Sequence, residues 1–124
     1  MGGTNFTRLE LLRSDLTRQQ LYEPLSYIGH DAEEMLGMVN KIIDEGQDIK
    51  TKQIIISGGI KSFLQGYYLI NKCKLPSIYG QASTFLQYAK EDYELIKQFI
   101  DYQVKGLSLA YAFLRVKESK SDVK

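Results

Sequence analysis

Apolar positions in residues 31–45 recur at the three- and four-residue spacing of an amphipathic α-helix. They are Met35, Leu36, Val39, Ile42 and Ile43. Asp31 stands where its carboxylate can cap such a helix, and Glu33 and Glu34 fall in the first turn, where negative charge complements the helix dipole. Gly46 follows the last apolar position, as glycine commonly does at a helix end. The pattern predicts a helix over residues 31–45.

The pattern changes at residues 53–57, where three consecutive isoleucines replace the helical spacing. An uninterrupted β-branched run is typical of a buried strand in a parallel sheet. Apolar residues then return to helical spacing and predict a helix over residues 63–71. A second short strand is predicted over residues 75–80, because Pro76 is tolerated at the first residue of a strand.

Beyond the second strand, residues 81–84 have the composition of a loop. Residues 91–115 then predict a long helix with one apolar stripe, interrupted by Gly106. The polar tail over residues 118–124 is expected to fray.

The first 30 residues have a weaker pattern. A Gly-Gly-Thr-Asn turn at residues 1–6 has no preceding element, so we expect that a part of the fold upstream of it is absent. Residues 9–12 predict a short helix. Residues 21–28 predict a short strand, since Pro24 opposes a full-length helix there.

Strands and helices therefore alternate, which is the pattern of βα units in a parallel sheet. Two arrangements fit this α/β pattern: a small open sheet with helices on both faces, or the closing portion of a (β/α)₈ barrel. A complete barrel takes about 250 residues. Because the chain has 124 residues, it could hold only the last few units of one.

Composition excludes several classes of protein. The chain is 44% hydrophobic and 25% charged, which is typical of a globular domain with a core. Its net charge of +1 does not suggest the basic face that nucleic acid or an anionic membrane would need. Cys73 is the only cysteine, and no apolar run approaches the roughly 18 residues that span a bilayer. We expect a cytoplasmic protein without a nucleic-acid or membrane partner.

Two glycine-containing segments carry the candidate chemistry. The run Ile-Ile-Ile-Ser-Gly-Gly-Ile-Lys at residues 54–61 ends a strand in two glycines, whose backbone N–H groups can approach an anion closely. The run Gly-Gln-Ala-Ser at residues 80–83 follows the second strand in the same way. In phosphate-binding barrels the anion lies between the loops after the last two strands, near a helix N-terminus. The two segments predict a site for a phosphate monoester.

These segments also resemble a known family. Gly-Gly-Thr-Asn-Phe at residues 2–6, Ile-Ser-Gly-Gly-Ile-Lys at residues 56–61 and Gly-Gln-Ala-Ser-Thr-Phe-Leu at residues 80–86 resemble, in order, the C-terminal part of the FMN-dependent (type II) isopentenyl-diphosphate isomerases. Ile28-Gly29 before Ala32-Glu33 adds to the likeness. The resemblance covers residues 2–117 and implies that residues 1–117 are the C-terminal part of an FMN-binding TIM barrel.

The resemblance implies cofactor-binding positions but no catalytic or metal-binding residue in this chain. The cofactor-binding positions, which match the family's FMN contacts, are Thr4, then Gly58, Gly59, Ile60 and Lys61 in the first phosphate loop, and Ala82 and Ser83 in the second. The chain departs from the family's pattern at three places. Lys61 replaces an arginine, Gln65 replaces an aspartate, and Lys-Leu-Pro at residues 74–76 replaces a Gly-Ala approach to the second loop.

The family converts isopentenyl diphosphate to dimethylallyl diphosphate with reduced FMN, NADPH to keep the flavin reduced, and Mg²⁺ to hold the substrate diphosphate. Its substrate-binding and metal-binding residues lie in an N-terminal portion that no position here matches. The resemblance thus implies an enzyme fragment that needs this N-terminal portion and is inactive alone. We also expect homo-oligomers, because a partial barrel leaves strand edges unpaired and such edges recruit other chains.

Two alternatives stay open. Another FMN-dependent barrel, such as a 2-hydroxy-acid oxidase or a glutamate-synthase-like domain, has a similar glycine loop. The oxidases need a catalytic histidine followed closely by an arginine, whereas no arginine follows His30 until Arg115. The second alternative is a non-catalytic phosphate-binding remnant that folds alone.

Overall fold

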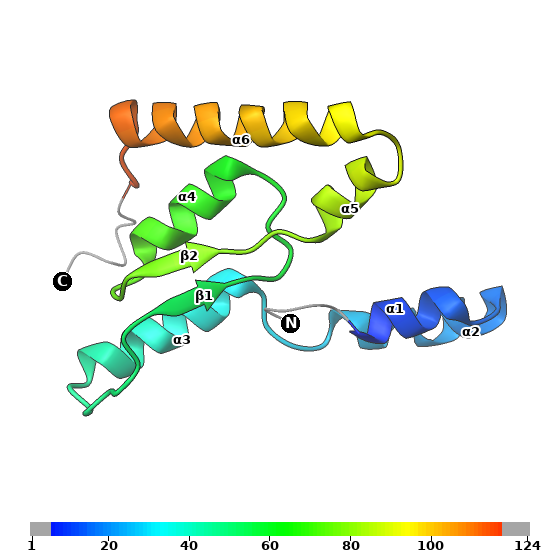
Figure 1. Cartoon of the computed structure of the whole chain (residues 1–124). Helices are drawn as coiled ribbons and strands as arrows, with labels where there is room; N and C mark the ends of the chain where they lie inside the picture. Colours follow the sequence, from blue (N-terminus) through cyan, green and yellow to red (C-terminus); the bar gives the residue numbers. More distant parts are fainter. Residues whose placement is uncertain (1–5, 118–124) are drawn as a thin grey trace.

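The computed structural model describes residues 6–117, which are mostly helical and include one small parallel sheet (Figure 1). The predicted opening turn, Thr4 and the polar tail lie outside these residues. In chain order the elements are α1 (Phe6–Arg13), α2 (Leu16–Tyr22), the 3₁₀-helix η1 (Glu23–Tyr27), α3 (Ala32–Asp44), β1 (Ile54–Ile56), α4 (Phe63–Lys72), β2 (Ser77–Tyr79), α5 (Ser83–Ala89) and α6 (Tyr93–Phe113).

The strands β1 and β2 are parallel, and each is three residues long. Ile55 is in register with Ile78. Two backbone hydrogen bonds extend the pairing, from Ile54 N–H to the carbonyl of Pro76 at 3.0 Å and from Gly80 N–H to the carbonyl of Ile56 at 2.8 Å. Both predicted strands are confirmed, although each is shorter than its predicted range.

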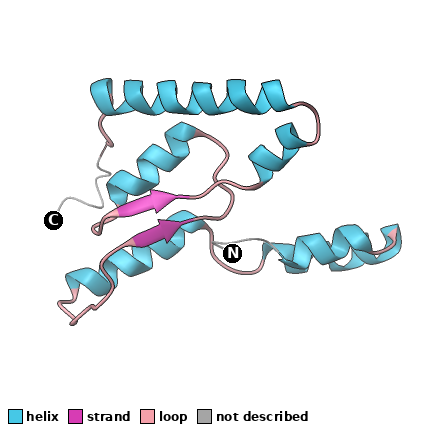
Figure 2. Cartoon of the chain, viewed as in Figure 1, coloured by secondary structure: helices cyan, strands magenta, loops and turns pink. Residues whose placement is uncertain are grey.

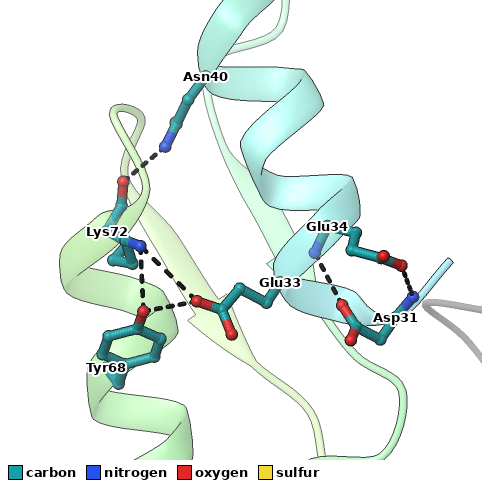
Figure 3. Close-up of polar contacts among 6 residues, drawn as sticks. All are labelled: Asp31, Glu33, Glu34, Asn40, Tyr68 and Lys72. Carbon is teal, nitrogen blue, oxygen red and sulfur yellow. Dashed lines mark hydrogen bonds and ion pairs between the residues drawn. The ribbon is translucent and has the colours of Figure 1, made fainter. Parts of the chain in front are cut away.

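The helix predicted over residues 31–45 is confirmed as α3, and its start is held by a capping box. The Asp31 side chain accepts the Glu34 N–H at 2.8 Å, and the Glu34 side chain accepts the Asp31 N–H at 2.9 Å (Figure 3). Such reciprocal bonds satisfy two N–H groups that a helix start otherwise leaves without partners. Ala32 and Leu36 are buried on the inner face of this helix.

Polar contacts connect α3 to α4 (Figure 3). The Asn40 side chain donates to the Lys72 carbonyl at 2.7 Å and accepts the Lys74 N–H at 3.0 Å, so that it holds the end of α4. Tyr68 Oη donates to Glu33 at 2.5 Å, and Lys72 Nζ lies 3.0 Å from Tyr68 Oη and 3.6 Å from Glu33. These contacts fix the two helices side by side.

The long helix α6 runs without a break through Gly106, so the predicted interruption there is wrong. Gly106 instead provides room for packing, because a Cβ at this position would lie 2.5 Å from the ring of Phe63 in α4. The ring of Tyr67 meets that of Tyr111 edge-on at 5.0 Å, and its hydroxyl donates to the Leu114 carbonyl at 2.9 Å. Aromatic contacts thus hold α6 against α4.

The core lies on one face of the sheet. It is formed by Ala32, Leu36, Ile56, Ile60 and Leu69, with Ile54 and Tyr79 packed against it. On the opposite face, the register neighbours Ile55 and Ile78 are 70% and 63% exposed. Parallel sheets are ordinarily covered on both faces. This apolar face is therefore uncovered by the described part of the chain.

Two further predictions, for residues 21–28 and for residues 81–84, are wrong. The strand predicted over residues 21–28 is the end of α2 followed by η1, because Pro24 lies in the first turn of a 3₁₀-helix, where the fixed φ of proline is favourable. The short helix α5 begins at Ser83, inside the predicted loop over residues 81–84. With α1 and α2, η1 forms an arm that extends from the sheet and its helices (Figure 1).

Candidate functional site

The loops after β1 and β2 leave the same edge of the sheet, because the strands are parallel and in register (Figure 2). The Gly80 N–H bond to the Ile56 carbonyl joins the two loops at their beginning. A Cβ built at Gly80 would lie 3.7 Å from the Cβ of Ser57, which is an ordinary van der Waals distance. The structure therefore brings together residues 57–61 and 80–83, the two segments predicted to form one site.

The glycine pair of the first loop has a backbone that favours glycine. The φ angles of Gly58 and Gly59 are 109° and 74°, in the region that side chains with a Cβ rarely adopt. A Cβ at Gly59 would meet no atom within 4 Å, so the loop is open there. Within residues 6–117, the backbone N–H groups of this pair have no hydrogen-bond partner. They are available to an anion.

The remaining residues of the first loop have different roles from the glycines. The Ile60 side chain is only 3% exposed and belongs to the core, so this residue can reach a ligand only through its backbone. The Ile60 carbonyl accepts a hydrogen bond from Gln81 Nε2 at 3.3 Å. The Lys61 side chain is exposed, but its backbone N–H donates to Gln65 Oε1 at 3.1 Å. The Lys61 amide is therefore already engaged.

Ser62 ends the loop as the N-cap of α4, and its Oγ accepts the Gln65 N–H at 3.2 Å. Neither this contact nor the roles of Gln65 and Gln81 are among the sequence-based predictions. Part of the signal is visible, because Ser62 and Gln65 have the S-x-x-Q spacing of a capping box. No local pattern indicates the Gln81 contact, which crosses from one loop to the other.

The second loop begins α5 without a side-chain cap. Ala82 occupies the N-cap position, and its methyl group cannot accept a hydrogen bond. Ala82 and Ser83 are both exposed at the sheet edge. In the described part of the chain, the Ser83 and Thr84 N–H groups have no partner, whereas Leu86 N–H bonds to the Ala82 carbonyl at 2.9 Å. Further backbone donors are thus open beside the glycine pair.

Tyr79, directly before the second loop, has an altered acidity. Burial raises the pKa of its phenol, and the nearby Tyr111 raises it further. A Cβ at Gly66 would lie 2.4 Å from the Tyr79 ring, so this ring packs on the backbone of α4. Tyr79 thus contacts the helices and remains a neutral group at physiological pH.

Other candidate groups are dispersed. His30 Nδ1 lies 3.6 Å from a Glu34 oxygen at the start of α3, and both side chains are more than half exposed. Across residues 6–117, no three His, Cys, Asp or Glu side chains gather at a distance suited to a metal ion. In the same range, no helix has the length and hydropathy required to cross a bilayer.

Comparisons with known proteins identify no relative. No protein-family model, no curated protein and no solved structure matches the chain. The geometry of the two loops is consequently the main structural evidence on function.

Proposed function

We propose that the two loops bind the phosphate of FMN and that the chain is the C-terminal part of a type II isopentenyl-diphosphate isomerase. The observation that carries this proposal is the juxtaposition of residues 57–61 with residues 80–83 at the carboxyl edge of two adjacent parallel strands. In open and closed α/β folds, ligands bind at this edge.

The residues present fit a phosphate group. Gly58 and Gly59 offer backbone N–H groups in an open loop, and Ser83 offers another at an uncapped helix start. Backbone donors do not depend on the side chain, so the presence of Lys61 in place of arginine leaves them unchanged. The Lys61 amide is an exception among the proposed contacts, since Gln65 already accepts it.

The uncovered sheet face supports the barrel part of the proposal. Ile55 and Ile78 would point into the interior of a barrel, where layers of branched side chains pack together. In this proposal an N-terminal portion contributes the remaining strands and the residues that bind isopentenyl diphosphate and Mg²⁺, and NADPH keeps the flavin reduced. The flavin supplies the proton-transfer chemistry, while this chain binds and orients its phosphate end.

Flavin-fluorescence quenching tests the proposal. The chain is titrated with FMN, and with riboflavin as the ligand without phosphate, both alone and with the N-terminal portion of a type II isomerase. FMN binding that requires the added portion supports the enzyme fragment. Tight FMN binding by the chain alone supports the non-catalytic phosphate-binding module instead. Equal affinity for FMN and riboflavin under both conditions contradicts a phosphate site.

Gly59 and Gly46 provide a matched pair of variants for this titration. Both have a φ of 74° and open space around a built Cβ, but only Gly59 lies in the loop. Alanine strains the backbone equally at the two positions. We expect Gly59→Ala to weaken FMN binding about tenfold through a displaced N–H donor, and Gly46→Ala to leave it unchanged. Equal effects of the two variants would assign the loss to stability alone.

A further inference from the structure

A single peptide unit in the first loop is held at both ends by glutamine side chains. Its carbonyl, on Ile60, accepts from Gln81 Nε2 at 3.3 Å, and its N–H, on Lys61, donates to Gln65 Oε1 at 3.1 Å. Gln81 lies in the loop after β2, whereas Gln65 lies in the first turn of α4. Two separate elements thus fix one peptide plane.

This peptide lies one residue beyond the glycine pair, which has the most permissive backbone in the loop. Rotation of a peptide plane turns its carbonyl and its N–H together, so a rotation here would break both glutamine bonds. The directions of the Gly58 and Gly59 N–H groups depend on where the chain is held after them. The only side-chain hydrogen bonds to the backbone of residues 58–61, within the described chain, are these two.

We propose that Gln65 and Gln81 are positioning residues that lock the Ile60–Lys61 peptide and thereby aim the glycine N–H groups at a phosphate monoester. This inference rests on the proposed phosphate site and adds the residues that set its geometry. The locked orientation commits the Lys61 N–H to Gln65. The phosphate is therefore bound by the glycine pair, without the Lys61 amide.

The two glutamines have opposite chemical requirements. Position 65 must accept a hydrogen bond, which a carboxylate also does. Position 81 must donate one, which a carboxylate cannot do, and a carboxylate there would face the Ile60 carbonyl. The same substitution, glutamine to glutamate, should therefore preserve the lock at Gln65 and break it at Gln81. Each variant adds one negative charge beside the loop, so their general electrostatic effects are matched.

The test compares Gln65→Glu, Gln81→Glu and the wild-type chain under the condition in which the wild-type chain binds FMN. Titrations with FMN and riboflavin in about 0.5 M salt screen the added charge. We expect FMN affinity within about threefold of wild type for Gln65→Glu and at least about tenfold weaker for Gln81→Glu, since a lost bond leaves a carbonyl opposed by a carboxylate. Riboflavin affinity should change in neither. Gln98→Glu, on the exposed side of α6, is the control and should match wild type.

Amide hydrogen exchange of Lys61 measures, without any ligand, whether the Ile60–Lys61 peptide is held in place. Its exchange should remain slow in Gln65→Glu and become faster in Gln81→Glu and in Gln65→Leu. The double variant Gln65→Leu/Gln81→Leu should bind FMN no more weakly than the worse single variant, because both act on one peptide.

Two results would overturn the proposal, and they are distinguishable. If the wild-type chain binds FMN and riboflavin equally, the phosphate site itself is wrong. If the wild-type chain prefers FMN while the two glutamate variants behave alike in affinity and in Lys61 exchange, the site stands and the lock is wrong.

Discussion

The arm (residues 6–27) and the sheet unit (residues 31–114) are stabilised in different ways. In the sheet unit, side chains distant in sequence meet, as when Tyr67 bonds to the Leu114 carbonyl and Asn40 to that of Lys72. In the arm, the side-chain hydrogen bonds of Asp15 to Arg18, of Gln19 to Ser14 and of Ser26 to Glu23 connect residues only three to five positions apart. Leu69 is 2% exposed, whereas Leu21 in the arm is 67% exposed.

This difference shows which part of the chain has a core of its own. The described arm residues bury only Ser26 and leave large apolar side chains exposed, namely Leu12, Leu16, Leu21, Tyr22, Leu25 and Tyr27. Its helices contact mainly one another. Short helices with little packing are marginal in water, because most helical stability in proteins comes from tertiary contacts. We therefore expect the arm to contribute little to global unfolding, and matched substitutions in the two regions test this.

The largest contrast should come from Leu69→Ala and Leu21→Ala. Removing the Leu69 side chain leaves a cavity in the core and should lower the free energy of unfolding by about 2–5 kcal/mol. The same change at the exposed Leu21 should stay within about 0.5 kcal/mol. Urea unfolding followed by circular dichroism measures both. Comparable losses at the two positions would show that the arm belongs to the core.

Alanine at Gly66 and at Gly37 should have opposite effects. A Cβ at Gly66 would lie 2.4 Å from the Tyr79 ring, so overpacking should cost about 1–3 kcal/mol. Gly37 is a helix-interior glycine of α3 with open space, where alanine should stabilise by about 0.5–1 kcal/mol. Thermal unfolding of the two variants provides the comparison. A stabilising Gly66→Ala would mean that Tyr79 does not pack on α4.

Asp31 in the sheet unit and Asp15 in the arm are N-caps of the same residue type, so the same substitution can be compared in the two regions. Each side chain accepts an N–H in the first turn of its helix. Asp31→Ala should reduce the free energy of unfolding by about 1 kcal/mol, since α3 is part of the cooperative unit. Asp15→Ala should reduce only the local helicity of α2, as seen by amide exchange. An equal loss of global stability from both variants would refute the independence of the arm.

The smallest effect is expected for tyrosine hydroxyls. Tyr68→Phe removes a contact between α4 and Glu33 of α3 that is partly exposed, and should cost about 0.5–1 kcal/mol. Tyr27→Phe removes a 3.2 Å contact to Glu23 within the arm and should have no measurable effect on global unfolding. The urea unfolding midpoints of the two variants measure these effects. A larger shift for Tyr27→Phe than for Tyr68→Phe would contradict the expectation that the arm contributes little to global unfolding.

How much of the fold could be predicted from the sequence also differs from one element to another. For α3, local signals agree, because Asp31 and Glu34 form the cap where the apolar periodicity begins. For residues 21–28, propensity and the position of Pro24 conflict, and no tertiary contact is visible in the sequence to decide between strand and turn. The short α5 was missed because Ala82 provides no capping signal.

The candidate site likewise has features that the sequence predicts and one that it does not. The glycine pair is recognisable, because two consecutive glycines at the end of a strand are typical of a loop with positive φ values, which Gly58 and Gly59 have. That this loop lies beside residues 80–83 follows from the parallel pairing of two strands, which the alternation of elements predicts. The bond between Gln81 and the Ile60 carbonyl is a tertiary contact across 21 residues, and no local pattern contains it.

Amide chemical-shift mapping with FMN, by nuclear magnetic resonance, tests the central claim most directly. With the N-terminal portion of a type II isomerase present, we predict that FMN shifts the amide signals of residues 58–59 and 82–84, that inorganic phosphate shifts the same signals, and that the arm does not respond. Signals that move mainly in the arm, or in only one of the two loops, would contradict a phosphate site built from both.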